Sequence, residues 1–299
     1  ARVASVRDRS RVAARDGSSW GSMDSGATSA LDNSEKLPRI LLTRGNDKAT
    51  VYLMGGTVTS YISGGVEWLA VRPDAKFDGS KPISGGLPFC FPQFGPGDMQ
   101  LHGFARNMTW KLLEEPTEAG TCVLELTDTP ESREMWPHAF RLEYKVELLE
   151  GKLATTLKVI NTSASDFNFQ AAIHSYYATM NVGACKIQGD FEGSTMIDRM
   201  GEKPKMGKGP SNTLQITKET DEIYKEVLPG AVTLSDPAKG DLKIVSGGGW
   251  RDVVIWNPFG NEAMGYDGFV CVESAECASV PLAKGQVWEA TMDLVPTAK

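Results

Sequence analysis

His174 and Glu273 are the side chains of this 299-residue chain whose surroundings best suit proton transfer. His174 lies among aromatic residues in the segment 169–177, where shielding from water would lower the pKa of its imidazole. Glu273 follows the apolar run 269–272, where burial would raise the carboxyl pKa toward the range of a general base. Taken singly, the histidine is also consistent with core packing and the glutamate with an exposed strand end.

The segment 82–110 is the second place where we expect chemistry. Its prolines prevent a regular strand, and its phenylalanines are too apolar for a solvated loop, so we expect a rigid, packed loop. Rigid loops on a sheet commonly carry binding groups, and this one supplies His102 and Arg106, with Gln100 just before them. Asp221 lies in an acidic stretch that, considered alone, is typical of a solvated face.

Composition and missing motifs exclude several classes of protein. The chain has 31 basic and 38 acidic residues, a formal charge of −7 and no basic run beyond its N-terminal segment, so no nucleic-acid partner is expected. Every apolar stretch is interrupted before the roughly 18 residues that a membrane helix needs, so no membrane partner is expected either. There is no Walker loop, His-Glu-x-x-His or Gly-x-Ser-x-Gly motif. Five scattered cysteines and three histidines predict reduced thiols, no metal site and no cofactor.

The elements that must position these residues follow a period of two. Apolar and charged residues alternate in 140–149, which predicts a half-buried strand, and 152–161 repeats the pattern after a Glu-Gly turn, which predicts a hairpin. Further strands are predicted at 49–54, 57–63, 66–71, 121–126, 232–235, 242–245, 253–256 and 287–294, and a single short helix at 131–136. Many strands with almost no helices between them predict an all-β fold, a large antiparallel sandwich.

The first 36 residues differ in composition from the rest. Five arginines between residues 2 and 15 are followed by a run rich in Ser, Gly and Ala. This is the composition of an organellar transit segment, with a disordered tail as the alternative, so we place the folded domain at 37–299. The leader favours a plastid, and the cytoplasm is the default otherwise. Two glycosylation sequons, at Asn107 and Asn161, are predicted to be unused.

Several short motifs occur in an order that is similar to that of a known family. They are Gly85-Gly-Leu-Pro with Phe91-Pro-Gln-Phe-Gly, His102-Gly-Phe-Ala-Arg106-Asn with Trp110 following, Trp136-Pro, His174-Ser-Tyr, Thr220-Asp221-Glu-Ile-Tyr224, Val254-Ile-Trp-Asn-Pro258 and Cys271-Val-Glu273. Over 38–295 the chain thus resembles the hexose-6-phosphate mutarotases, or glucose-6-phosphate 1-epimerases, of the aldose 1-epimerase superfamily. The resemblance implies a galactose-mutarotase-like β-supersandwich whose concave face holds one small sugar phosphate.

The resemblance also implies a role for each candidate residue. It makes His174 the general acid and Glu273 the general base, and it places His102, Arg106 and Asp221 in contact with the substrate. Interconverting the anomers of a pyranose requires removal of the proton from the C1 hydroxyl while the ring oxygen is protonated. One base and one acid with pKa values near neutrality therefore suffice, without a metal or a nucleotide.

Two departures from the family pattern concern the phosphate. Ser84 stands before Gly-Gly where the family usually has Arg, and Leu101 stands before His-Gly where it usually has Gln, with Gln100 one place earlier. Arg106 could still bind phosphate through two parallel hydrogen bonds, and we expect Ser84 and Gln100 to contact the substrate as well. The residues that could compensate for the missing arginine are Lys81, Lys76 and Arg72.

The sequence leaves three functions open. The leading one is anomer interconversion of a hexose 6-phosphate, with glucose 6-phosphate first; the second is the same reaction on a neutral or other aldose, with Ser84 marking the changed specificity. The third is a catalytically silent carbohydrate-binding sandwich. Trp256 and Phe94 are candidates for stacking on the sugar, and Glu276 is a less favoured carboxylate than Glu273. No self-complementary surface can be recognised, so no oligomeric state is predicted.

Overall fold

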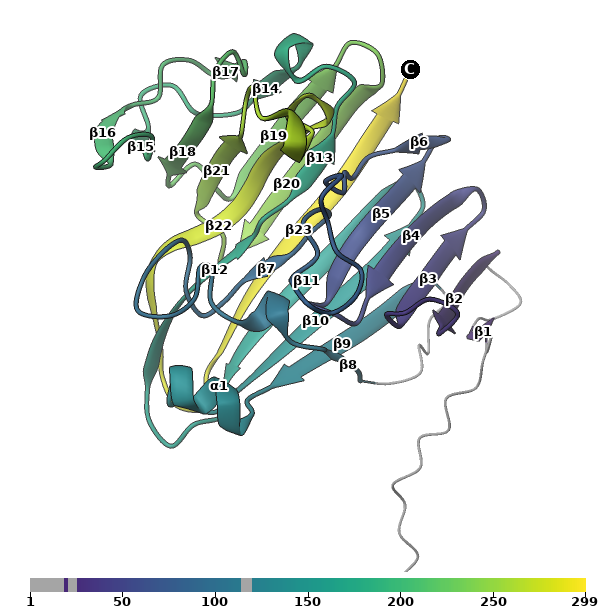
Figure 1. The fold of residues 1–299 in the computed structure, drawn as a ribbon, viewed down its shortest axis with the longest axis vertical. Coiled ribbons are helices and arrows are strands. Elements are labelled where there is room, and N and C mark those ends of the chain that lie inside the picture. Colours follow the sequence, from purple (N-terminus) through teal and green to yellow (C-terminus); the bar gives the residue numbers. More distant parts are fainter. Residues whose placement is uncertain (1–18, 21–25, 114–119) are drawn as a thin grey trace, which may run out of the picture.

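Residues 19–20, 26–113 and 120–299 are described by a computed structural model, in which antiparallel strands form three sheets (Figure 1). A six-stranded sheet follows chain order, with β1 (Ser19–Trp20), β2 (Ala27–Asp32), β3 (Arg39–Arg44), β4 (Asp47–Tyr52), β5 (Thr57–Ser63) and β6 (Val66–Glu67). A nine-stranded sheet has the order β17 (Thr213–Leu214), β14 (Lys186–Gln188), β19 (Gly230–Asp236), β20 (Gly240–Gly248), β23 (Val287–Ala298), β11 (Lys152–Asn161), β10 (Phe140–Leu149), β9 (Thr121–Thr127) and β8 (Lys111–Leu112). An eight-stranded sheet has the order β16 (Lys205–Lys208), β15 (Thr195–Asp198), β18 (Thr220–Lys225), β21 (Asp252–Asn257), β22 (Phe269–Leu282), β12 (Phe167–Ile173) and β7 (Phe89–Cys90), and β13 (Tyr176–Ala178) also pairs with β22.

Helices are few and short in the described part of the chain. They are α1 (Pro130–Met135) and four 3₁₀ turns, η1 (Ala105–Asn107), η2 (Val182–Ala184), η3 (Glu262–Met264) and η4 (Tyr266–Gly268). None of the helices described is long and apolar enough to cross a membrane. The all-β antiparallel class predicted from the sequence is thus confirmed, as is the single helix near 131–136.

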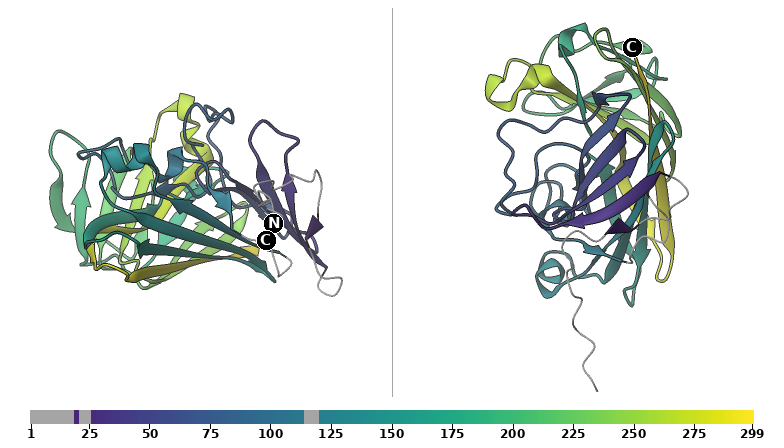
Figure 2. Two further views of the ribbon diagram at one scale, coloured as in Figure 1. Left: turned by 90° about the horizontal axis from the view of Figure 1, so that it is seen from below. Right: turned by 90° about the vertical axis from the view of Figure 1, so that its right-hand side faces the viewer.

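One hydrophobic core joins the three sheets. Leu42 of β3, Leu142 of β10 and Val253 of β21 all belong to it, and all three are buried. Figure 2 shows the N-terminal sheet standing beside the two larger ones. Because this core is shared, separating the N-terminal sheet would expose apolar surface on all three, at about 25 cal/mol per Å².

The predicted strands are confirmed except at one place. The hairpin is present, with Phe140 opposite Asn161 and Leu149 opposite Lys152. The strand predicted at 66–71 is wrong beyond Glu67, because the following residues bond to different segments in turn. Ala70 donates its N–H to Tyr176 O, and Arg72 donates to Ser84 O, so only isolated bridges form there.

The boundary predicted at residue 37 also needs correction. Strand β2 (Ala27–Asp32) lies inside the segment assigned to the leader and pairs along its whole length with β3. Ser29 is fully buried, and its hydroxyl donates to Thr121 O while accepting from Gly120 N. Small residues that looked like linker composition therefore pack as a strand. The arginine-rich part of the leader lies in 1–18, outside the described residues.

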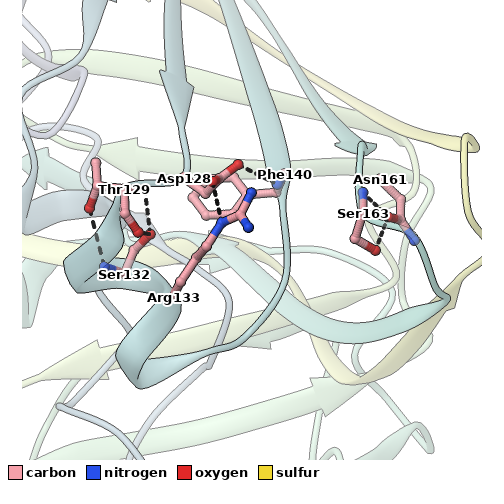
Figure 3. Close-up of polar contacts among 7 residues, drawn as sticks. All are labelled: Asp128, Thr129, Ser132, Arg133, Phe140, Asn161 and Ser163. Atoms are coloured by element: carbon pink, nitrogen blue, oxygen red, sulfur yellow. Dashed lines mark hydrogen bonds and ion pairs between the residues drawn. The ribbon is translucent and has the colours of Figure 1, made fainter.

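Hydrogen bonds at the open end of the β10–β11 hairpin, where Phe140 is opposite Asn161, stabilise the segments before β10 and after β11 (Figure 3). Helix α1 begins with a capping box, in which Thr129 Oγ1 accepts from Ser132 N and Ser132 Oγ accepts from Thr129 N. After β11, Asn161 accepts from Ser163 N with its side-chain oxygen and donates from Nδ2 to Ser165 O and Leu282 O. A buried amide with both protons in use is a poor glycan acceptor, consistent with the unused sequon predicted at Asn161.

Candidate active site

A cleft of about 500 Å³ opens on one face of the eight-stranded sheet. Its floor consists of residues of β13, β18, β21 and β22 together with His174 between β12 and β13, and its walls come from the segments 72–84, 95–106 and 199–204. The lining residues are Arg72, Ser84, Gly95, Pro96, Leu101, His102, Arg106, His174, Tyr176, Arg199, Pro204, Asp221, Trp256 and Glu273. Six of the seven predicted site residues are therefore brought together in one cleft.

Strand register places His174 opposite Glu273. Ile173 at the end of β12 pairs with Ser274, and Tyr176 at the start of β13 pairs with Cys271, so the same register makes His174 and Glu273 cross-strand neighbours. Opposite residues point to the same face of a sheet, with Cβ atoms about 4.5–5.5 Å apart. His174 Nδ1 indeed lies 3.3 Å from Glu273 Oε1.

A second row of side chains adjoins this pair on the same face. Strand pairing aligns one residue from each of four neighbouring strands in this row. In order across the sheet they are Asp221 of β18, Trp256 of β21, Cys271 of β22 and Tyr176 of β13. The Tyr176 ring stacks on the His174 ring, with centroids 4.9 Å apart and planes at 8°. The floor thus combines an acid–base pair, an aromatic platform and a carboxylate.

Burial displaces the pKa values of the pair in opposite directions. Glu273 is 2% exposed, and burial raises its pKa well above the usual value, although Arg199 and Arg106 oppose the rise. His174 is 8% exposed, and burial, together with nearby cationic groups including Arg106, lowers its pKa well below the usual value. Both shifts favour the uncharged groups. The pair therefore holds one proton over a broad pH range, between the lowered pKa of His174 and the raised pKa of Glu273.

His102 is held by the loop that the sequence predicted to be rigid. Gly95 N–H donates to His102 Nδ1 over 3.2 Å, and Cys90 Sγ lies 3.1 Å from the same nitrogen. Burial, with Arg106 and Arg199 nearby, lowers the pKa of His102 to about 3. Because Nδ1 accepts, we infer that Nε2 carries the proton of the neutral ring, which makes His102 a fixed hydrogen-bond donor in the cleft.

Gly103 allows this loop to approach Phe91, the residue after β7, closely. Its φ is +69°, and a Cβ there would lie 2.2 Å from Phe91 O. We expect Gly103→Ala to lower the free energy of unfolding by about 2–5 kcal/mol, from left-handed strain plus overpacking. Urea unfolding monitored by tryptophan fluorescence would measure the loss.

The matched control is Gly151→Ala, at a glycine with φ +67° and open space around its missing Cβ. It carries only the left-handed penalty of about 1–2 kcal/mol. Equal losses in the two variants would contradict a specific close approach at Gly103.

Three guanidinium groups line the cleft, and they are differently partnered. Arg106 donates from Nη2 to Leu101 O, and its buried Nε has no acceptor among the residues described. Arg199 donates from Nε to Asp221 Oδ1 over 2.9 Å and its backbone N–H donates to Asp221 O. Arg72 forms a two-pronged pair with Asp74. Arg106 is therefore the guanidinium with no carboxylate partner in the described chain.

Arg199 and Tyr176 were not recognised from the sequence. Arg199 follows β15 and reaches the cleft because β15 pairs with β18, which carries Asp221. No local pattern marks that pairing. Tyr176 could have been found, because alternation in 169–177 already placed it on the face of His174.

Gln100 is the predicted site residue that the structure keeps out of the cleft. Its side chain is exposed, and its carbonyl oxygen accepts from Gly103 N in the tight turn before His102. Glu276 is buried outside the cleft, near Arg251, as expected of the less favoured carboxylate. Of the two candidate stacking residues, Trp256 lines the cleft, whereas Phe94 packs behind it against His102.

One trio among the described residues could approach a metal ion together, namely His174, Cys271 and Glu273. Their ligand atoms lie within 4.8 Å of one another. Burial raises the pKa of the Cys271 thiol well above its usual value, so the thiolate that a metal bond requires is disfavoured. The donor set is therefore better suited to proton exchange than to metal binding.

Comparison with known proteins shows that the chain is similar to sugar epimerases. The family model described as aldose 1-epimerase matches residues 38–294. A provisionally named glucose-6-phosphate 1-epimerase of Cenchrus ciliaris is 29% identical over 267 residues, covering 82% of this chain and 80% of its own. A protein of Escherichia coli K12 with the same provisional name is 28% identical over 257 residues, covering 81% of this chain and 84% of its own.

Solved structures share the fold. A provisionally named mutarotase from Salmonella typhimurium superposes with a TM-score of 0.78 at 24% identity, covering 91% of this chain and 94% of its own. A galactose 1-epimerase from Lactobacillus acidophilus superposes with a TM-score of 0.65 at 14% identity, covering 89% and 96%. The galactose-mutarotase-like sandwich predicted from the sequence is confirmed.

Proposed function

The chain belongs to the aldose 1-epimerase family, and from that premise we propose that it interconverts the α and β anomers of a hexose 6-phosphate, glucose 6-phosphate in the first place. The observation that carries the proposal is the buried His174–Glu273 pair, facing each other in a cleft that also holds Arg106. The pair suits the chemistry at the anomeric carbon, and the arginine suits the phosphate.

The reaction needs one proton to leave and one to arrive. Glu273 Oε2 is buried without a hydrogen-bond partner among the described residues, so it is free to take the proton of the C1 hydroxyl. His174 Nδ1 faces Glu273, which leaves Nε2 to give a proton to the ring oxygen. The C1–O5 bond then breaks, the open aldehyde rotates about C1–C2, and the same two groups return the protons as the ring closes on the other face.

Burial assists the ring-opening half of this cycle. Before proton transfer, Glu273 is charged and His174 carries a proton; afterwards both groups are neutral. Since burial disfavours the charged form of each, it favours the transfer of protons to and from the sugar. His102, Asp221 and Ser84 line the same cleft and are proposed to bind sugar hydroxyls. Gln100 is left out of this proposal because it does not reach the cleft.

Anomer exchange measured by NMR on glucose 6-phosphate, glucose and galactose tests the proposal. We expect the highest kcat/KM with glucose 6-phosphate. A preference for a free sugar would support the neutral-aldose alternative. Sugar binding without acceleration would support the silent carbohydrate-binding alternative.

Arg106 is proposed as the principal phosphate ligand. Replacing it with Ala should lower kcat/KM for glucose 6-phosphate by about 10–150-fold, since a hydrogen bond to a charged group contributes about 1.5–3 kcal/mol. The value for free glucose should change less than about threefold, because that substrate has no phosphate to lose.

The matched control is Arg133→Ala, at an exposed arginine of α1 that pairs with Asp128 outside the cleft. It should leave both rates unchanged. If Arg106→Ala slowed the two sugars equally, the phosphate assignment of Arg106 would be wrong.

The proposed compartment rests on the N-terminal composition. With β1 and β2 assigned to the fold, the transit-like segment shortens to residues 1–18. Its arginine content supports a plastid, which imaging of the full chain fused at its C-terminus to a fluorescent protein would test.

A further inference from the structure

We propose that Arg72 is the second guanidinium of the phosphate subsite and that it sets the preference for phosphorylated over free hexose. This inference rests on the function proposed above. Three cations could have supplied that charge, and the structure separates them. Arg72 lines the cleft and its side chain is 13% exposed, whereas Lys76 and Lys81 are exposed and contribute nothing to the lining.

Arg72 lies beside Ser84 on one wall of the cleft. Its backbone N–H donates to Ser84 O over 2.9 Å, and the preceding Val71 forms a bridge with Gly85. Ser84 also lines the cleft but carries no charge. A positive charge at position 72 therefore lies in the same part of the cleft wall as a charge carried by a long side chain at position 84 would.

Two hydrogen bonds to Asp74 hold the Arg72 guanidinium in one orientation, which prepares it to bind an anion. Nε donates to Asp74 Oδ1 over 2.9 Å and Nη2 donates to Asp74 Oδ2 over 2.6 Å. This fork uses two of the five N–H groups of an arginine and leaves three. Asp74 is 49% exposed and is not part of the cleft lining, so it fixes the guanidinium from outside the cleft.

Arg199 is the less suitable partner for phosphate. Its Nε and Nη2 both approach Asp221 Oδ1, at 2.9 and 2.8 Å. Asp221 itself lines the cleft, so an anion beside Arg199 would meet a carboxylate. A phosphate dianion is better matched by Arg106 together with Arg72, the two guanidinium groups without a carboxylate inside the cleft.

The connectivity of the sugar places the phosphate near Arg72. In a pyranose, C6 is attached to C5, which is bonded to the ring oxygen, so the phosphate must lie near the group that protonates that oxygen. His174 has that role in the proposed mechanism, and the ring of Tyr176 stacks on it. Ala70, two residues before Arg72, donates its N–H to Tyr176 O over 3.0 Å. The segment that carries Arg72 therefore borders the acid side of the cleft.

Steady-state kinetics of Arg72→Gln on two substrates test the inference. We expect kcat/KM for glucose 6-phosphate to fall by about 10–100-fold, mostly through KM, and that for free glucose to change less than about threefold. Lys76→Gln removes an exposed cation four residues away and should change neither value. The double variant Arg72→Ser with Ser84→Arg returns a guanidinium to the same wall and should recover most of the lost preference.

Each outcome decides between the alternatives. A wild type that does not prefer glucose 6-phosphate overturns the proposed substrate, and this inference with it, before any variant is made. With that preference present, an equal loss on both sugars makes Arg72 a structural residue, and no loss on either removes it from the site; both results overturn the inference. If Arg72→Gln does not fold, as judged by its thermal transition, Arg72→Lys keeps the charge without the fork and should show an intermediate preference.

Discussion

Replacing Glu273 with Gln is expected to lower kcat for anomer interconversion of glucose 6-phosphate by about 10²–10⁴-fold, the range of a lost general base. The amide has the shape of the carboxylate but cannot take the proton of the C1 hydroxyl. It is also uncharged, so it suits a site where burial already raises the pKa of the carboxyl and favours a neutral group. Two-dimensional exchange NMR, in which the α and β signals of the substrate interconvert, measures the rate.

Binding provides the control for this variant. Calorimetry should show glucose 6-phosphate bound with an affinity within about threefold of the wild type, because the lost interaction belongs to the transition state. Glu276→Gln alters a second buried carboxylate of β22, outside the cleft, and should retain full activity. A Glu273→Gln enzyme that kept its rate, or a Glu276→Gln enzyme that lost as much, would refute the assignment of the base.

Replacing His174 with Gln should lower kcat by a similar factor, about 10²–10⁴, because the ring oxygen would then receive its proton from water. The pH dependence should change as well. In the wild type, activity falls below the lowered pKa of His174, where the pair gains a second proton, and above the raised pKa of Glu273, where it loses its only one. With His174 absent, the residual activity requires only ionised Glu273, so it should rise with pH without a falling limb.

His138 offers the matched control for the acid. It lies between Trp136 and Phe167, away from the cleft, so His138→Gln should keep both the rate and the bell-shaped profile. If the bell persisted in His174→Gln, the falling limb at high pH would have to come from another group, and His174 would not be the acid.

Much of the sandwich could be predicted from the sequence, because its strands alternate apolar and polar residues. The hairpin of β10 and β11 is the clearest case, since a Glu-Gly turn separates two regular patterns. Strand β2 was missed because alanine and serine bury little apolar surface and have the composition of a linker. The segment after Glu67 was misassigned because its hydrogen bonds go to two different partners.

From the residues alone, the site could be predicted only where its members were contiguous, and the family resemblance supplied the joint roles of His174, Glu273 and Asp221. His102 and Arg106 lie four residues apart, and the loop between them carries both to one wall. The meeting of His174 with Glu273 depends on the register between β12, β13 and β22, which a sequence read without its relatives does not contain. The same is true of Arg199 and Asp221, which depend on β15 pairing with β18. Gln100 was predicted to contact the substrate because it lies two residues before His102, but the tight turn there directs its side chain out of the cleft.

The positions of β22 and β23 have a consequence for how the molecule is made. These are the last two strands of the chain, yet β22 lies between β21 and β12 in one sheet, and β23 lies between β20 and β11 in the other. During synthesis on the ribosome, each of these sheets is two unjoined halves until its central strand emerges from the exit tunnel. Such late, long-range pairing leaves earlier strands with open edges and makes folding slow. Since Glu273 lies on β22, the nascent protein acquires its proton acceptor in the same late step that joins the halves of its sheet.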